Sequence, residues 1–69
     1  MVRMRARRLE LKLSQQALGY HAKVSIADVS KMEGGWLKPY PSQAERIAKV
    51  LDLRPDELLV PVEMEARRA

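Results

Sequence analysis

Residues 13–35 read LSQQALGYHAKVSIADVSKMEGG, and this stretch decides how the chain folds. Ser14 suits the start of a helix, because its hydroxyl can accept from the amides of the first turn, and we expect this helix to reach about His21. Ser25, with Asp28 three residues later, forms a capping box that opens a second helix. The two glycines at the end of the stretch should terminate it, since glycine readily adopts the left-handed conformation of a helix exit.

The connection between these two helices has to be tight. Gly19 provides the small residue that closely approaching helices need, and Leu18, Val24 and Val29 are expected to lock the crossing from inside. One side of the second helix stays uncovered in this arrangement. The pattern therefore predicts a helix pair whose second member is free to enter a groove.

Another helix is expected before this pair, from about Arg3 to Lys12. Met4, Arg8 and Leu11 share one of its faces, at spacings of four and three residues. A charged side chain in the middle of an apolar stripe needs a partner if it is buried.

The chain beyond the two glycines should begin as a loop and continue as a helix. Residues 36–41 contain two prolines and cannot form a helix or a central strand. Ser42 with Glu45 is a further capping box, and we expect it to open a helix that ends near Asp52. The inward stripe of that helix is Ala44, Ile47, Ala48 and Leu51.

Pro55 suits the first position of a fifth, short helix, after which Leu58 and Leu59 return to the core. Phenylalanine is absent, β-branched residues are sparse, and the common residues favour helices over strands. We predict an all-α fold, a compact bundle of five short helices. The expected organisation is one domain over residues 1–60 and a charged tail over residues 61–69.

Composition excludes several classes of function. The 69-residue chain has no cysteine and one histidine, so we expect no disulfide, metal site or cofactor. Its longest apolar run, residues 58–62, is far shorter than the roughly 20 residues of a membrane span, and a cytoplasmic location is expected. No supported nucleophile or carboxylate pair indicates an enzyme or a small-molecule substrate. The net charge of +4 is compatible with a polyanionic partner.

Short motifs follow one another at fixed distances: LSQQALG at 13–19, VS at 24–25, VSKMEGG at 29–35, Pro39, IAKVL at 47–51 and PDELL at 55–59. They cover about Met4 to Leu59 without an insertion, and in this combination the chain resembles the Xre/Cro-CI family of helix-turn-helix proteins. The resemblance implies a lambda repressor-like domain that binds double-stranded DNA in the major groove. It further implies a transcriptional regulator, such as a repressor, that acts as a homodimer.

The resemblance also implies a structural ion pair. In many family members an arginine of the first helix pairs with the glutamate that closes the reading helix, and these positions are Arg8 and Glu33 here. The alternative is that Arg8 is an ordinary surface arginine. Two positions depart from the family: Lys23 stands where the turn is often glycine, at a cost of about 1 kcal/mol if it is left-handed. Arg7 stands at a commonly apolar position, so we expect the first helix to pack less fully.

Carried over position by position, the resemblance places Ile26, Ala27 and Lys31 where family members contact base edges. Ile26 and Ala27 can rest on a thymine methyl group, and Lys31 can donate to guanine O6 and N7. Gln15, in the first turn of the preceding helix, is expected to meet a phosphate. Ser25 is first a helix cap and only secondarily a phosphate contact.

The loop residues allow two interpretations each. Trp36 either covers the loop as a core residue or lies along the sugar-phosphate backbone, and we include it among the DNA-binding candidates. Lys38 is either a phosphate clamp held beside Pro39 or a solvated loop lysine. Tyr40 is expected to be structural, and His21 to be a surface residue.

A second class of function competes with DNA binding. The same fold can serve as an antitoxin-like or adaptor module whose main partner is a protein. The reading face supports this alternative, because Ile26, Ala27 and Asp28 offer no cation and only Lys31 is basic. Asp28 would repel phosphate and is assigned to the capping box.

Overall fold

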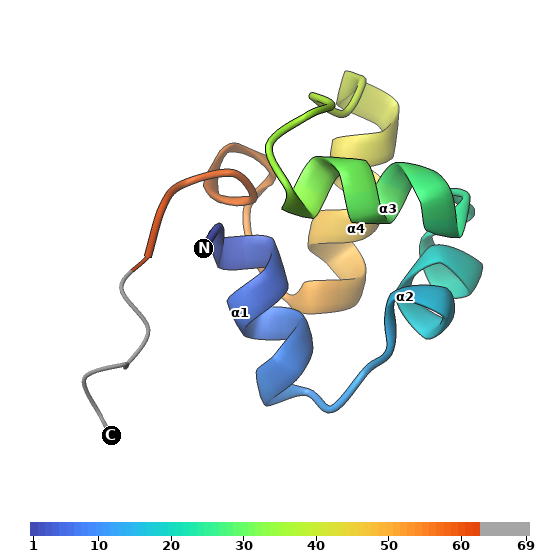
Figure 1. The fold of residues 1–69 in the computed structure, drawn as a ribbon. Coiled ribbons are helices and arrows are strands. Elements are labelled where there is room, and N and C mark those ends of the chain that lie inside the picture. Colours follow the sequence, from blue (N-terminus) through green and yellow to red (C-terminus); the bar gives the residue numbers. More distant parts are fainter. Residues whose placement is uncertain (63–69) are drawn as a thin grey trace.

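The computed structural model describes residues 1–62, and these residues form four α-helices and one 3-10 turn (Figure 1). The helices are α1 (Arg3–Glu10), α2 (Gln15–Ala22), α3 (Ile26–Glu33) and α4 (Pro41–Leu51), and the 3-10 turn is η1 (Pro55–Glu57). The expected all-α class is confirmed. Helix α2 packs against α3 and α4, and α4 also contacts α1 and η1. Most of the expected charged tail, from residue 63 onward, lies outside the described residues.

Both helices of the pair are capped by the serines that the sequence predicts, but the Asp28 side chain makes no reciprocal bond, so the expected capping box is only half formed. The Ser14 hydroxyl accepts from the Ala17 amide at 2.9 Å at the start of α2, and the Ser25 hydroxyl accepts from the Asp28 amide at 3.1 Å at the start of α3. Of the two glycines that follow α3, Gly35 is left-handed, with φ +83°, whereas Gly34 has an ordinary helical φ of −85°.

The turn between α2 and α3 explains Gly19. A Cβ atom at this position would press into the carbonyl oxygen of Val24, which is rigid backbone. The Val24 amide in turn donates to the Gly19 carbonyl at 2.9 Å. Lys23, between them, has φ 60° and ψ 45°, so the left-handed turn position that favours glycine is occupied by a lysine.

The core lies where the four helices meet. Its buried apolar residues are Met4, Leu18, Ala22, Val24, Val29, Met32, Ile47, Ala48, Leu51 and Leu58. The expected members Ala44 and Leu59 are only partly buried and pack at its edge. The placement of Leu11 in the inward stripe was wrong: α1 ends at Glu10, so Leu11 leaves the helical face and is 39% exposed.

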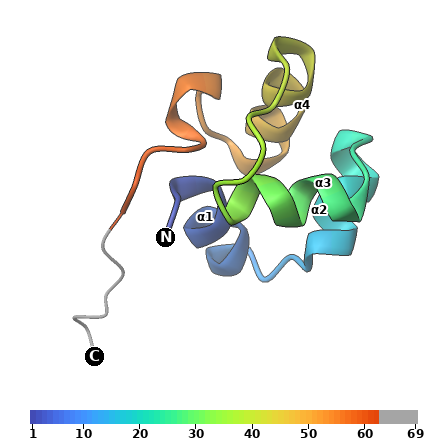
Figure 2. The same cartoon turned by 45° about the horizontal axis from the view of Figure 1, so that its top comes forward.

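The prediction of a fifth helix was wrong, because Pro55–Glu57 forms only a single 3-10 turn. The following carbonyls have other partners: Leu58 and Val60 accept from the amides of Met4 and Arg3, at 2.9 and 2.8 Å. Carbonyls used in this way are unavailable to a continuing helix. The segment instead runs beside the N-terminus, where Val2 and Pro61 form an antiparallel bridge (Figure 2).

The start of α4 also differs from the prediction. The helix begins at Pro41 with Tyr40 as its N-cap, and the Tyr40 amide donates to the Gln43 side-chain oxygen at 3.0 Å. Proline suits the first helical position because its missing N–H needs no partner there. The expected cap at Ser42 with Glu45 was therefore placed two residues too late. Tyr40 itself is 72% exposed, so its expected role as a structural plug is also wrong.

Two arginines attach one helix to the C-terminal end of another. Arg7 of α1 donates through Nε to the Leu51 carbonyl of α4 at 2.9 Å, and Arg46 of α4 donates to the Ala22 carbonyl of α2 at 2.8 Å. Cations are favourable at helix C-termini, where the last carbonyls lack partners within the helix. Arg7 thus contributes a hydrogen bond between α1 and the end of α4.

Candidate nucleic-acid interface

A buried ion pair holds the C-terminal end of α3. Arg8 Nε donates to Glu33 Oε2 at 2.7 Å, and a second guanidinium nitrogen donates to Oε1 at 3.0 Å, so the pairing is bidentate. The two residues are only 6% and 8% exposed. A charge buried to this degree is tolerated only with a partner, because removal from water costs several kcal/mol per ion.

Two further contacts extend the pair into a polar cluster, which we define as Arg8, Glu33, Gln15 and the Leu13 carbonyl. The remaining guanidinium nitrogen of Arg8 donates to the Leu13 carbonyl at 2.8 Å, and the Gln15 amide donates to Glu33 Oε1 at 3.1 Å. The polar cluster therefore joins α1, the α1–α2 loop, α2 and α3. It fixes the start of α2 relative to the end of α3.

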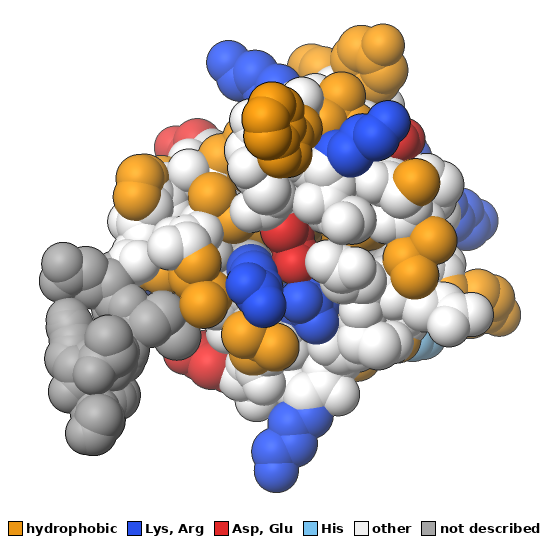
Figure 3. Space-filling view, viewed as in Figure 1, with side chains coloured by type: hydrophobic (Ala, Val, Ile, Leu, Met, Phe, Trp, Pro, Cys, Tyr) orange, Lys and Arg blue, Asp and Glu red, His pale blue; other side chains and the backbone are white. Residues whose placement is uncertain are grey.

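A second arginine stands at the mouth of the polar cluster. Arg5 Nε lies 3.9 Å from Glu33 Oε1, beyond hydrogen-bond distance, and 44% of its side chain is exposed. Both Glu33 oxygens already accept from Arg8 and Gln15. Arg5 therefore makes no hydrogen bond to Glu33, and its charge is in excess of the one carboxylate in the cluster. Figure 3, with α3 in front, shows a small acidic spot bordered by basic side chains at the centre of this face.

The outer side of α3 is free of protein contacts that would bury it. Ile26 is 50% exposed, and Ala27 and Lys31 are also exposed, whereas Val29 and Met32 are fully buried on the opposite side. The helix has eight residues and is capped at its first turn. Three of the expected base-contacting residues thus share one exposed side of a rigidly seated helix.

The loop from residue 36 to residue 40, called the exposed loop below, alternates between two sides. Trp36 and Tyr40 are 85% and 72% exposed and Lys38 is exposed, while Leu37 and Pro39 are partly buried. Alternation of this kind is the property of extended chain. The structure places Trp36 outside the core, which removes the first of its two interpretations.

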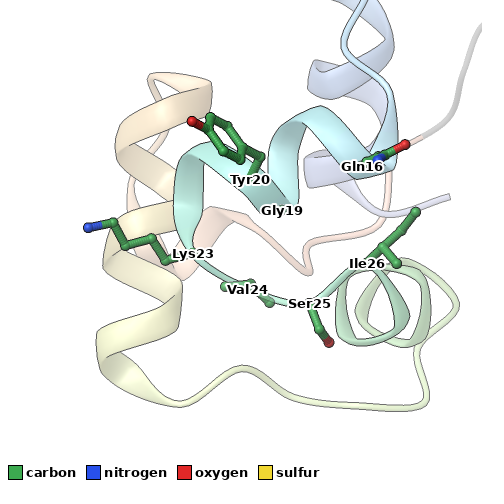
Figure 4. Close-up of a pocket in the computed structure, with 7 residues that line it drawn as sticks. All are labelled: Gln16, Gly19, Tyr20, Lys23, Val24, Ser25 and Ile26. Atoms are coloured by element: carbon green, nitrogen blue, oxygen red, sulfur yellow. The ribbon is translucent and has the colours of Figure 1, made fainter.

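A shallow groove of about 460 Å³ runs along the α2–α3 turn (Figure 4). Gln16 and Ile26 lie at one end of it, and Tyr20 and Lys23 project at the other. Ser25 also lines the groove, and it is exposed. The groove brings Gln16, on α2, beside the first residue of α3.

Two short helices that meet at a turn too close for a side chain at Gly19, with the second helix exposed, define a helix-turn-helix unit. This unit is the structural class that the fold and the exposed face establish, and it points to DNA as partner. The sequence profile described as helix-turn-helix domain matches residues 2–60, and the chain belongs to this family. No curated protein and no solved structure matches the chain.

Neither a membrane-spanning helix nor a metal site is found in the described part of the chain. No helix within residues 1–62 is long and apolar enough to cross a membrane. The same residues contain no group of three or more histidine, cysteine, aspartate or glutamate side chains placed to hold a metal ion.

Sequence reasoning missed three features of this surface. Gln15 was expected to face a phosphate, yet its amide is half-buried and donates to Glu33. Arg5 was not considered as a site residue, although it lies three residues before Arg8 and hence on the same face of α1. Gln16 was not considered, and it is exposed beside Ile26.

Proposed function

We propose that the chain is a sequence-specific transcriptional regulator of the Xre/Cro-CI type that binds double-stranded DNA with α3 in the major groove. One observation carries the proposal: α3 is buried and fixed along one side and exposes Ile26, Ala27 and Lys31 along the other. A major groove about 12 Å wide admits one α-helix, and side chains on its free side meet base edges.

The roles of the reading residues follow from their chemistry. Ile26 and Ala27 cannot form side-chain hydrogen bonds, so they recognise apolar surface, which in the major groove is the thymine methyl group. Lys31 lies more than one turn further along α3 and donates to guanine O6 and N7. The half-site therefore contains thymine near the start of α3 and guanine further in.

Phosphate contacts position the helix in this proposal. Lys38 and Trp36 approach the backbone from the exposed loop, and Ser25 and Gln15 from the starts of α3 and α2. Gln15 offers its second amide hydrogen, because the first is given to Glu33. The surplus cation of Arg5 adds to the attraction for phosphate.

A homodimer is part of the proposal, since one helix-turn-helix makes few base contacts and two copies on half-sites one helical turn apart double them. A role on DNA also implies a cytoplasmic location.

In vitro selection of bound duplexes, followed by affinity measurements over a salt series, tests the proposal. We expect a two-fold symmetric motif and a slope of log affinity against log salt of about −3 to −6 for a dimer. Lys31→Ala should relax preference at one position by about 1–3 kcal/mol while the rest of the motif is retained. A flat salt dependence with no selected motif would contradict DNA reading and favour the antitoxin-like or adaptor module.

A further inference from the structure

Trp36 is exposed beyond what the fold requires. Its side chain is 85% exposed, more than that of any other large apolar residue in the described part of the chain. The ring therefore contributes little burial to folding, because hydrophobic stabilisation follows the area removed from water. Tryptophan is enriched at interfaces, where its ring combines a large apolar surface with a polar N–H group.

The backbone of Trp36 is fastened to the last turn of α3. Its amide donates to the Lys31 carbonyl at 2.8 Å, and the Gly35 amide donates to the Met32 carbonyl at 3.1 Å. Gly35 makes this closure possible through its left-handed φ of +83°. Trp36 thus starts from a fixed position on the same turn that carries the base-reading candidate Lys31.

The missing side chain of Gly34 leaves space for the Trp36 ring. A Cβ atom at Gly34 would lie 2.9 Å from Cδ1 and 3.3 Å from Nε1 of the Trp36 indole, so the ring edge occupies the space that the missing side chain leaves. The backbone of Gly34, with φ −85° and ψ −3°, is open to any residue. The glycine therefore leaves room for the indole in this orientation, and an alanine at this position would push the ring aside.

We propose that Gly34 is a positioning residue that seats the Trp36 indole, and that this pre-placed ring is laid against the DNA sugar-phosphate backbone beside the groove read by α3. The inference rests on the proposed function. Lys38 shares the outer side of the exposed loop with Trp36, and its charge attracts the phosphates between which a sugar offers an apolar surface. The backbone of Trp36 is already fixed by its hydrogen bond to Lys31, so little backbone entropy is lost when the ring makes contact.

A double-mutant cycle on the full chain tests this inference, with the parent, Gly34→Ala, Trp36→Ala and the double variant. Affinity for the selected duplex and for a scrambled duplex is measured by fluorescence anisotropy, and stability by denaturant melts. Trp36→Ala should weaken binding to both duplexes about three- to tenfold, with an unchanged melt. Gly34→Ala should give a similar loss in the parent and no further loss in the Trp36→Ala background.

Tyr20→Ala is the matched control, because Tyr20 is 78% exposed but lies on α2, outside the exposed loop. Because Tyr20 also lines the groove along the α2–α3 turn, Leu9→Ala serves as a second control. It removes an exposed apolar side chain of α1 that does not line this groove, and we expect it to bind both duplexes as the parent does. Trp36 is the single tryptophan of the chain, so its emission reports the contact directly: the parent spectrum should change on addition of duplex, and the Gly34→Ala spectrum should change less.

Each other outcome has a definite meaning. If Trp36→Ala binds like the parent while the parent selects a motif, the backbone contact is overturned and the proposed function stands. If Gly34→Ala lowers affinity equally with and without Trp36, the positioning role is overturned. If the parent binds no duplex and its emission is unchanged, the proposed function fails and this inference fails with it.

Discussion

The polar cluster and the exposed loop both adjoin the end of α3, yet they are built in opposite ways. In the polar cluster, the Glu33 side chain is 3% exposed, and its carboxylate accepts three hydrogen bonds from Arg8 and Gln15. In the exposed loop, Trp36, Lys38 and Tyr40 all project outward. The contrast teaches that the same helix end holds the residues that fix the reading helix and the residues that are free to bind. Substitutions should separate these two properties.

The largest expected effect is on stability, at Arg8. Arg8→Ala should lower the free energy of unfolding by about 3–5 kcal/mol, because Glu33 would remain buried without its charge partner. Urea denaturation followed by circular dichroism measures this loss. Arg54→Ala is the control, since its pair with Asp56 has both side chains 76% exposed and should change little. A loss below about 0.5 kcal/mol for Arg8→Ala would show that the pair is not buried in solution.

Gln15 should show an intermediate effect. Gln15→Ala removes one of the three hydrogen bonds to Glu33, and we expect a loss of about 1 kcal/mol in unfolding free energy. Gln16→Ala changes the exposed neighbouring glutamine and should leave stability unchanged. Equal unfolding free energies for the two variants would show that the Gln15 hydrogen bond to Glu33 does not stabilise the fold.

Lys23 should give a smaller effect of opposite sign. Lys23→Gly relieves a left-handed lysine at φ 60°, and we expect a gain of up to about 0.5 kcal/mol after the added chain entropy of glycine is subtracted. Lys49→Gly, at a helical position in α4, should instead destabilise by about 1 kcal/mol. Thermal melts compare the two, and a loss for Lys23→Gly would argue against strain at the turn.

The exposed loop should give the smallest effect on stability. Lys38→Ala should alter the unfolding free energy by less than about 0.5 kcal/mol. Its effect should appear on DNA, as a uniform weakening across sequences with a salt slope flatter by about one unit. Arg5→Ala provides a comparison, because Arg5 lies beside the polar cluster. A similarly flatter salt slope for this variant would show that the Arg5 charge is available to phosphate. An unchanged salt slope for Lys38→Ala would show that Lys38 does not contact a phosphate and is simply solvated.

Local signals in the sequence predicted the helix pair well, because they act within a few residues. Ser14 and Ser25 cap the helices they were expected to cap, and Gly19 lies where no Cβ fits. The errors arose where distant segments compete for the same backbone groups. The fifth helix fails because the amides of Arg3 and Met4 take the carbonyls of Val60 and Leu58, which no local pattern near Pro55 reveals.

The candidate site divides in the same way. The exposed side of α3 follows from its helical period, so Ile26 and Lys31 could be placed from the sequence. The attachment of Gln15 to Glu33 joins residues 18 positions apart, and only the packed structure reveals it. The seating of Trp36 on Gly34 was equally hidden, because Gly34 resembles an ordinary helix-ending glycine.

The chain segments at residues 1–2 and 60–62 pair with each other, so the two ends of the described chain lie side by side. The Met1 amine lies 3.4 Å from the Val62 carbonyl, and the Val62 amide donates to the Met1 carbonyl at 2.8 Å. A short peptide could therefore join these residues, and new ends could be opened in another exposed loop, without moving any helix. Such a circularly permuted chain would keep every contact around α3. The order of the helices along the chain is thus separable from their arrangement in space.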